Sequence, residues 1–258
     1  MGWKAKRGWG LGVAGGGVSP EGIGVGIIGG GLDVIGGAIG VIPGSGSGSG
    51  FEAPGLLLRT LHAIGYCYSW TGSGYLYKSS AVYATAREAA DADGHYHNGI
   101  GCGQQKNAVY RIDRGGLYFN TGAYLPSDAK VKSVTLKLVC YVDRSDLDFL
   151  VIPVCGDDLD GHNLVNADYG DLFDETFAYG SWTTEDFVQD TQILIPLNAA
   201  FYPKVALLTA APYTKVGLRS LRDIDGDVPT GDEVVYFYAA ETGKYPYLTV
   251  TYTSESLG

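Results

Sequence analysis

Glycine is distributed unevenly along this chain, and its distribution constrains the fold more than any other feature. Half of the forty glycines in the 258 residues lie within the first fifty positions. Between Gly8 and Gly50 they alternate with small or β-branched apolar residues and end in the Gly/Ser segment 44–50. Glycine weakens helices, and such a segment has few large side chains with which to fill a core. We therefore predict an extended arm over residues 1–50 that closes with a flexible linker.

The arm needs another surface to lie against. Its glycines permit close backbone approach, and its branched side chains could occupy shallow grooves on neighbouring subunits or pair with sheet edges. The residues that we expect to make these assembly contacts are Ile23, Val25, Ile27, Ile28, Val34, Ile35, Ile39, Val41 and Ile42.

The rest of the chain has the two-residue period of β-strands. Alternation on 131–139 places Val134, Leu136 and Leu138 on a core face, with Thr135 and Lys137 facing solvent. We predict an all-β fold, an antiparallel, jelly-roll-like β-sandwich over residues 107–258. The expected strands are 109–112, 116–119, 131–139, 149–152, 191–195, 205–208, 216–218, 233–238 and 247–252.

Residues 51–106 form an N-terminal extension, either part of the sandwich or a small second domain. We expect a hairpin that joins 66–70 to 75–77 through a turn at 71–74. A brief helix is predicted near 82–90, and the glycine and histidine cluster 91–103 is predicted to be a long loop.

Four segments together resemble a known kind of module. The segment 114–119 ends in Phe, Leu125-Pro126 follows, and strands are expected at 131–138 and 246–252. This pattern, over residues 107–253, resembles the DNRLRE-type β-sandwich, which is similar to carbohydrate-binding modules and to bacteriophage virion proteins. The resemblance implies a sandwich fold with a binding or structural role, and no enzyme activity follows from it.

Charge and composition argue against two classes of partner. The net charge is −10, and an acidic chain with few basic clusters is a poor match for the phosphates of nucleic acid. The apolar N-terminal run is rich in glycine and is interrupted by Glu21 and Asp33, so it fits poorly as a membrane span. We expect neither a nucleic-acid nor a membrane partner, although membrane association through the glycine-rich segment is a third functional hypothesis.

Carboxylates gather on one late loop. Asp223, Asp225, Asp227 and Asp232 have a spacing that could surround Ca²⁺, the one cofactor that the sequence suggests, although Asp-Gly is also common in turns. A weaker site of the same kind is 157–162. His95, His97 and Cys102 could also present a transition-metal site, with solvated histidines as the alternative.

Nineteen tyrosines give the chain candidate ligand-binding groups. Tyr236 and Tyr238 share one face of a predicted strand and could form a flat platform for a sugar. We find no nucleophile elbow and no local catalytic triad, and therefore expect no enzyme. The cysteines lack close pairing and are expected to be buried thiols, with a Cys140–Cys155 disulfide as the alternative.

These observations favour a non-enzymatic assembly protein. The first hypothesis is a virion component, such as a head decoration, capsid-stabilising or fibre-base protein, whose arm contacts its own copies and other virion subunits. The alternative is a carbohydrate- or receptor-binding module, secreted or on a phage tip, for which the arm is a tether and surface glycans are the partners.

Overall fold

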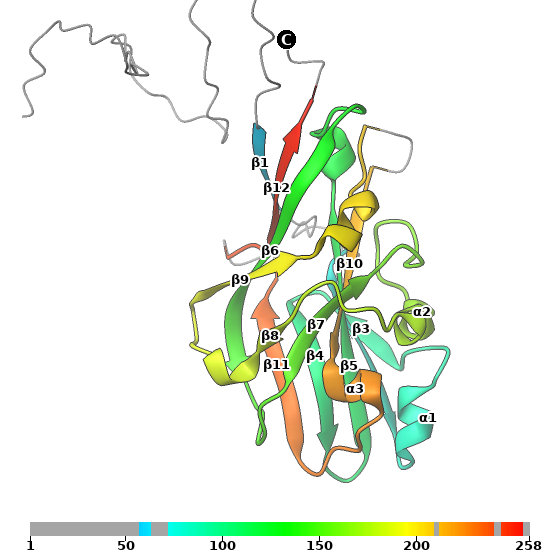
Figure 1. Cartoon of the computed structure of the whole chain (residues 1–258). Coiled ribbons are helices and arrows are strands. Elements are labelled where there is room, and N and C mark those ends of the chain that lie inside the picture. Colours follow the sequence, from blue (N-terminus) through cyan, green and yellow to red (C-terminus); the bar gives the residue numbers. More distant parts are fainter. Residues whose placement is uncertain (1–56, 63–71, 209–211, 240–243, 255–258) are drawn as a thin grey trace, which may run out of the picture. The chain divides into compact units, whose positions relative to one another are not determined.

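Twelve strands form one antiparallel sheet in the part of the chain that the structure describes. This computed structural model describes residues 57–62, 72–208, 212–239 and 244–254 (Figure 1). The sheet runs in the order β1-β12-β6-β11-β4-β5-β10-β7-β8, while β2 pairs with β3 and β5, and β9 pairs with β6. The prediction of a mostly β, antiparallel fold is therefore confirmed.

The elements follow one another along the chain with short connections. The strands are β1 (Leu57–His62), β2 (Gly74–Ser80), β3 (Gly94–Tyr96), β4 (Gly99–Lys106), β5 (Tyr110–Phe119), β6 (Lys130–Asp143), β7 (Leu150–Cys155), β8 (Trp182–Thr183), β9 (Gln192–Leu197), β10 (Thr214–Ser220), β11 (Asp232–Tyr238) and β12 (Tyr247–Thr253). The helices are α1 (Tyr83–Arg87), α2 (Asp168–Asp174) and α3 (Leu221–Asp225), with 3₁₀ turns at Thr121–Ala123, Thr184–Asp186 and Ala199–Lys204.

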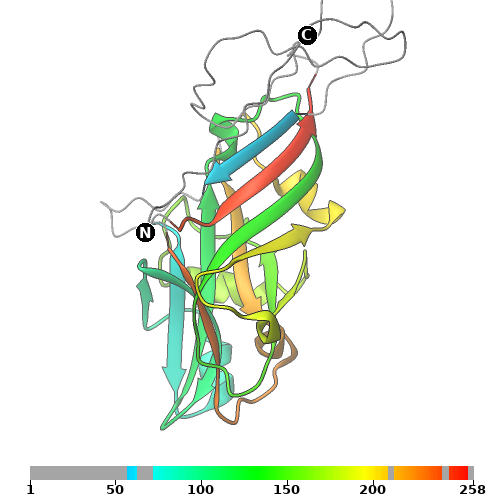
Figure 2. The ribbon, with the colours of Figure 1, turned by 90° about the vertical axis from the view of Figure 1, so that its left-hand side faces the viewer.

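The sheet is strongly curled and has the form of a half-barrel. The long strand β6 joins the part that contains β1, β12 and β9 to the part that begins at β11. Over 130–139 it pairs with β12 and β9, and over 140–143 it pairs with β11. Figure 2 shows β1, β12, β6 and β9 side by side. The register shifts between Tyr236 and Phe237, and a β-bulge of this kind increases the local twist. The change of partner along β6 therefore coincides with a bend in the sheet.

One hydrophobic core gathers side chains from both parts of the sheet. Val134, Leu136 and Leu138 are buried there, as the alternation on β6 predicts. Lys137 departs from its predicted solvent exposure, because its side chain is largely buried and its Nζ lies 4.2 Å from the centroid of the Tyr247 ring. Curling lets strands that are distant in the sheet bury apolar surface against one another, the dominant favourable term in folding.

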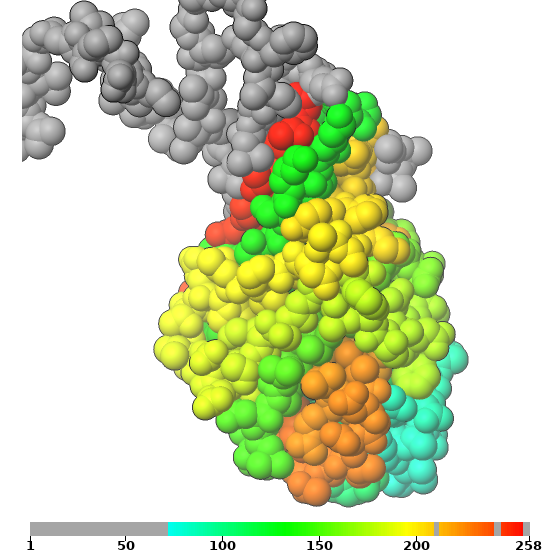
Figure 3. All heavy atoms as spheres, in the orientation of Figure 1, coloured from blue at the N-terminus to red at the C-terminus, as the bar shows by residue number. Residues whose placement is uncertain are grey.

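A second core lies beneath the three helices. Leu76 and Ile112 of the sheet pack there with Ala86 of α1 and with Tyr169 and Leu172 of α2. Figure 3 shows the α3 segment, in orange, next to the α1 segment, in cyan. No helix among the described residues is long and apolar enough to cross a membrane.

Several local predictions are wrong. The predicted loop 91–103 contains β3 and the first half of β4. Its glycines allow close packing, since a Cβ on Gly101 would lie 2.9 Å from ring atoms of Tyr75 and of Tyr236. The predicted strands 109–112 and 116–119 form the single strand β5, and 205–208 follows a 3₁₀ turn and is not a strand.

The helix predicted near 82–90 is confirmed as α1, and β2 to β4 belong to the same sheet as the strands that follow them. The predicted arm 1–50 and the first hairpin segment 66–70 lie outside the described residues.

Candidate ligand-binding site

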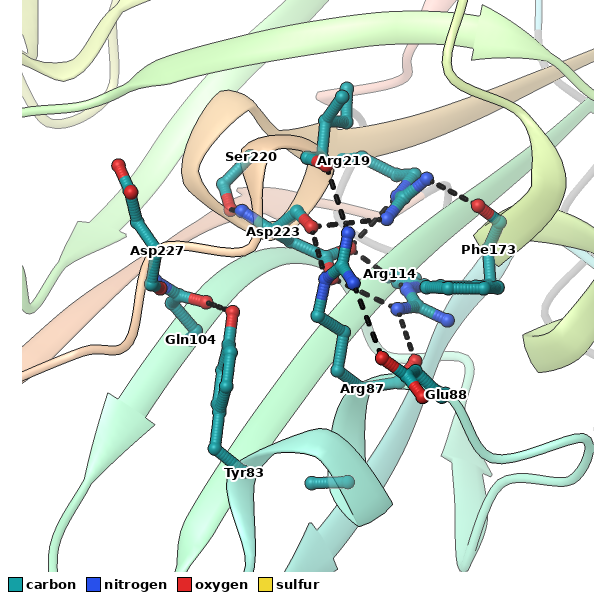
Figure 4. A network of polar contacts seen from close by, with 12 residues as sticks. Tyr83, Arg87, Glu88, Gln104, Arg114, Phe173, Arg219, Ser220, Asp223 and Asp227 are labelled. Carbon is teal, nitrogen blue, oxygen red and sulfur yellow. Dashed lines mark hydrogen bonds and ion pairs between the residues drawn. The ribbon is translucent and has the colours of Figure 1, made fainter.

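The structure does not bring the four predicted calcium ligands together. Asp223 is buried, while Asp225 and Asp227 are exposed and Asp232 begins β11. Both carboxylate oxygens of Asp223 accept hydrogen bonds from arginine (Figure 4). They are therefore occupied by protein cations, and among the described residues no group of three or more His, Cys, Asp and Glu side chains could hold a metal ion.

Asp223 is instead the centre of a buried ion cluster. Arg114 donates from Nε and Nη2 at 2.9 Å each, and Arg219 donates from Nε at 2.8 Å. The remaining groups of the two guanidinium ions donate to the backbone carbonyls of Tyr169, Arg87, Phe173 and Glu175. Both arginines are 0% exposed, so their guanidinium groups are shielded from water. A buried charge requires hydrogen-bonding partners of this kind.

The cluster connects the helices to the sheet. Arg114 lies on β5, Arg219 on β10 and Asp223 on α3, and Arg87 of α1 donates to the Asp223 carbonyl at 2.7 Å. Burial raises the pKa of Asp223, but the two arginines outweigh it and lower that pKa to about 2. The carboxylate therefore stays ionised at neutral pH and has a structural role.

The other predicted metal sites are also not formed. His95 Nδ1 lies 3.1 Å from Asn166 Oδ1, and Cys102 is fully buried. Asp157 pairs with Lys204 at 2.6 Å. Cys102, Cys140 and Cys155 are buried free thiols, so Cys140 and Cys155 do not form the alternative disulfide. Burial raises the pKa of Cys155 to about 11, which leaves its thiol protonated.

One hollow on the described surface has a volume of about 390 Å³ and is lined by tyrosines from four strands. We call it the tyrosine hollow. Tyr96 of β3 and Tyr141 of β6 present the most exposed rings, at 43% and 44% of their surface. The lining residues are Tyr75, Tyr96, Asn98, Gly99, Arg111, Tyr141, Val142, Arg144, Tyr236 and Tyr238.

Strand register and glycine create this hollow. Tyr236 faces Gly101 across β11 and β4, and Tyr75 faces Gly115 across β2 and β5. Because Gly101 carries no side chain, the two tyrosine rings lie over the sheet at this glycine and meet edge to face, with centroids 5.5 Å apart. Tyr75 also stacks on Tyr96 at 5.2 Å. The rings support one another in the geometry that aromatic pairs prefer.

A buried carboxylate supports the floor of the hollow. Asp113 is 1% exposed and accepts hydrogen bonds from Arg111 Nε at 2.7 Å and Tyr236 Oη at 2.8 Å. Burial and the nearby carboxylate raise the pKa of Tyr75 to about 12, and the same causes raise the pKa of Tyr236. Both phenols are therefore neutral at physiological pH, so their hydroxyls can donate and accept hydrogen bonds.

Tyr238 stands at the edge of the hollow. Its ring is tilted against Tyr141, with centroids 4.8 Å apart, and Lys244 Nζ lies 4.2 Å from its centroid. Its hydroxyl donates to Asp190 at 2.7 Å. Tyr141 and Asp190 are solvent-exposed, so Tyr238 forms an outer wall of the hollow, whereas Tyr236 belongs to its floor.

The structure places the two predicted tyrosines, Tyr236 and Tyr238, in the lining of the same hollow. Sequence reasoning missed the partners from other strands, chiefly Tyr75, Tyr96 and Tyr141. These partners depend on register between strands far apart in the sequence. Only the alternation of Tyr75 with Tyr77 was a local signal of an aromatic face.

Fold and site together define a mostly β protein with an antiparallel, curled sheet and an aromatic surface hollow supported by a buried ion pair. No family model and no curated protein matches the chain. The hollow itself must therefore supply the argument about function.

Proposed function

We propose that this chain is a non-enzymatic carbohydrate-binding protein, with the tyrosine hollow as its sugar site. The observation that carries the proposal is the convergence of tyrosines from four strands on one open hollow with arginine and asparagine side chains among them. Aromatic rings offer apolar faces to the C–H faces of a sugar ring, and the polar groups fix its hydroxyls.

The charges of the hollow favour binding over cleavage. Most glycoside hydrolases need two carboxyl groups on opposite sides of the scissile bond. None of the described residues that line the tyrosine hollow is a carboxylate, and Asp113 beneath it is already held by Arg111 and Tyr236. A sugar bound there would meet hydrogen-bonding groups without a general acid and base pair.

A glycan array probed with the full-length protein tests the proposal, followed by titration calorimetry on the strongest hits. We expect Tyr96→Ala and Tyr141→Ala to weaken binding by at least ~10-fold, about 1.4 kcal/mol each. Tyr124→Ala is the matched control, because Tyr124 is 58% exposed and lies outside the hollow. Failure to bind any glycan, or equal weakening by the control, would refute the proposal.

A second candidate function is assembly of a virion, supported by the glycine-rich sequence 8–50 and its Gly/Ser linker. In this proposal the arm threads between copies of the chain and other virion subunits, and the curled sheet is a variant of the jelly-roll-like β-sandwich of DNRLRE-type modules. Secretion is the alternative location. The two functions are compatible, because a displayed virion protein can also bind surface glycans.

Light scattering of the full-length protein tests the assembly function. We expect defined oligomers, and we expect the double substitution Ile27→Asp and Ile35→Asp to dissociate them because charged side chains cannot occupy apolar grooves. The melting temperature of the globule should not change. Monomers in both samples, or unchanged oligomers in the variant, would count against the role of the arm.

A further inference from the structure

A second hollow lies beside the tyrosine hollow, along the same strand. It has a volume of about 270 Å³ and is called the lysine hollow here. Lys137 and Val139 of β6 line it, and Tyr141 of β6 lines the tyrosine hollow. Alternate residues of a strand share a face, so Lys137 and Val139 lie on one face of β6, and Tyr141 follows them at the β-bulge where β6 changes partner. The full lining of the lysine hollow is Lys137, Val139, Asp190, Gln192, Lys244, Tyr245 and Tyr247.

A single group of side chains connects the two hollows. Tyr238 lines the tyrosine hollow, and its hydroxyl donates at 2.7 Å to Asp190, which lines the lysine hollow. Lys244 also donates to Asp190 and covers the ring of Tyr238. The side chains of Lys244 and Asp190 are 39% and 55% exposed, so the boundary between the two hollows faces solvent. A ligand that crosses it would meet hydrogen-bonding groups.

The length of the combined surface decides what kind of sugar it suits. From Lys137 to Arg144 the chain advances seven residues, which is at most roughly 23 Å at ~3.3 Å for each residue of a strand. That distance exceeds the length of a single sugar ring. From this continuity we infer that the two hollows form one elongated site, which binds a linear oligosaccharide along its length. The inference rests on the proposed sugar-binding function and specifies its ligand.

The two hollows differ in the interactions that they offer. The tyrosine hollow supplies ring faces for stacking, whereas the lysine hollow supplies ammonium, amide and carboxylate groups from Lys244, Gln192 and Asp190. Stacking anchors the first sugar units, and the polar groups bind hydroxyls of the units that follow. A disaccharide therefore gains its affinity from the tyrosine hollow alone, and a longer chain gains from both.

A ladder of oligosaccharides tests the inference with the full-length protein. Calorimetric titrations would use cello-, malto- and galacturono-oligosaccharides from the disaccharide to the hexasaccharide. For the series that binds, we expect affinity to rise at least ~10-fold with length and then reach a plateau. Gln192→Ala should largely remove this increase without changing the affinity for the disaccharide, because Gln192 lines the lysine hollow and not the tyrosine hollow. Gln192 is an exposed residue of β9, so this variant should fold normally.

Gln189→Ala is the matched control, because Gln189 is an exposed glutamine that lines neither hollow. It should leave the whole affinity ladder unchanged. Equal affinity for disaccharide and hexasaccharide, or equal weakening of both by Gln192→Ala, would overturn the elongated site while sugar binding itself stands. Absence of binding by every member of the three ladders would overturn the sugar-binding function and this inference together.

Discussion

Asp223→Ala should be among the most destabilising single substitutions in the described part of this protein. The change removes the one carboxylate that, among residues 57–62, 72–208, 212–239 and 244–254, accepts hydrogen bonds from Arg114 and Arg219. Both guanidinium ions are 0% exposed, so water cannot replace the lost partner without opening the helices from the sheet. Two cations would then remain buried with backbone carbonyls as their acceptors among the described residues.

The expected loss in the free energy of unfolding is about 3–5 kcal/mol, the usual result of removing one member of a buried ion pair. Since domains are commonly stable by only about 5–15 kcal/mol, a loss of this size would be a large part of the total. The control is Asp225→Ala, two residues away on the same helix and exposed, for which we expect a change within about 0.5 kcal/mol.

Denaturation in guanidinium chloride at pH 7 measures both changes. Intrinsic tryptophan fluorescence can report unfolding, because Trp182 packs edge to face on the core residue Phe237. The reasoning would be refuted if Asp223→Ala lost less than about 1 kcal/mol, or if the two substitutions had the same effect. Either result would mean that the arginines find other partners at little cost.

Three further predictions follow from the same contacts. Because the folded pKa of Asp223 is about 2 and its unfolded value is about 3.9, its contribution to stability is complete above about pH 5 and is lost as the pH falls toward 2. Denaturation between pH 5 and 2 should therefore show wild type losing about 2–3 kcal/mol more than Asp223→Asn. Tyr236→Phe, which removes the phenol donor of buried Asp113 and leaves it with Arg111, should cost about 1.5–3 kcal/mol in urea denaturation. Tyr238→Phe should cost well under half as much because its partner is exposed, and equal costs would contradict this account of the hollow. Gly101→Val should displace the tyrosine rings that its Cβ would approach to 2.9 Å, with a loss of about 1–3 kcal/mol and of glycan binding in calorimetry; unchanged binding would show that the ring positions do not matter.

The sequence alone predicted the class of fold, because strand alternation is a local property. Val134, Leu136 and Leu138 point to the core on β6, and most predicted strands are found within a few residues of their predicted bounds. The local sequence pattern predicted the wrong structure where glycine permits close packing between strands. The segment 91–103 has the composition of a loop, yet its glycines allow β4 to lie beneath the rings of Tyr75 and Tyr236.

Only the tertiary structure decided what the charged and aromatic residues do. Asp223 belongs to an acidic loop by sequence, but its partner Arg114 lies 109 positions earlier, and burial with that arginine makes it a structural ion instead of an exposed ligand. Tyr236 and Tyr238 were identifiable as a pair on one strand face. Their union with Tyr75, Tyr96 and Tyr141 depends on the register of strands that are distant in sequence. Alternation fixes which way a side chain points from its own strand, whereas pairing and curl of the sheet decide which other side chains it meets.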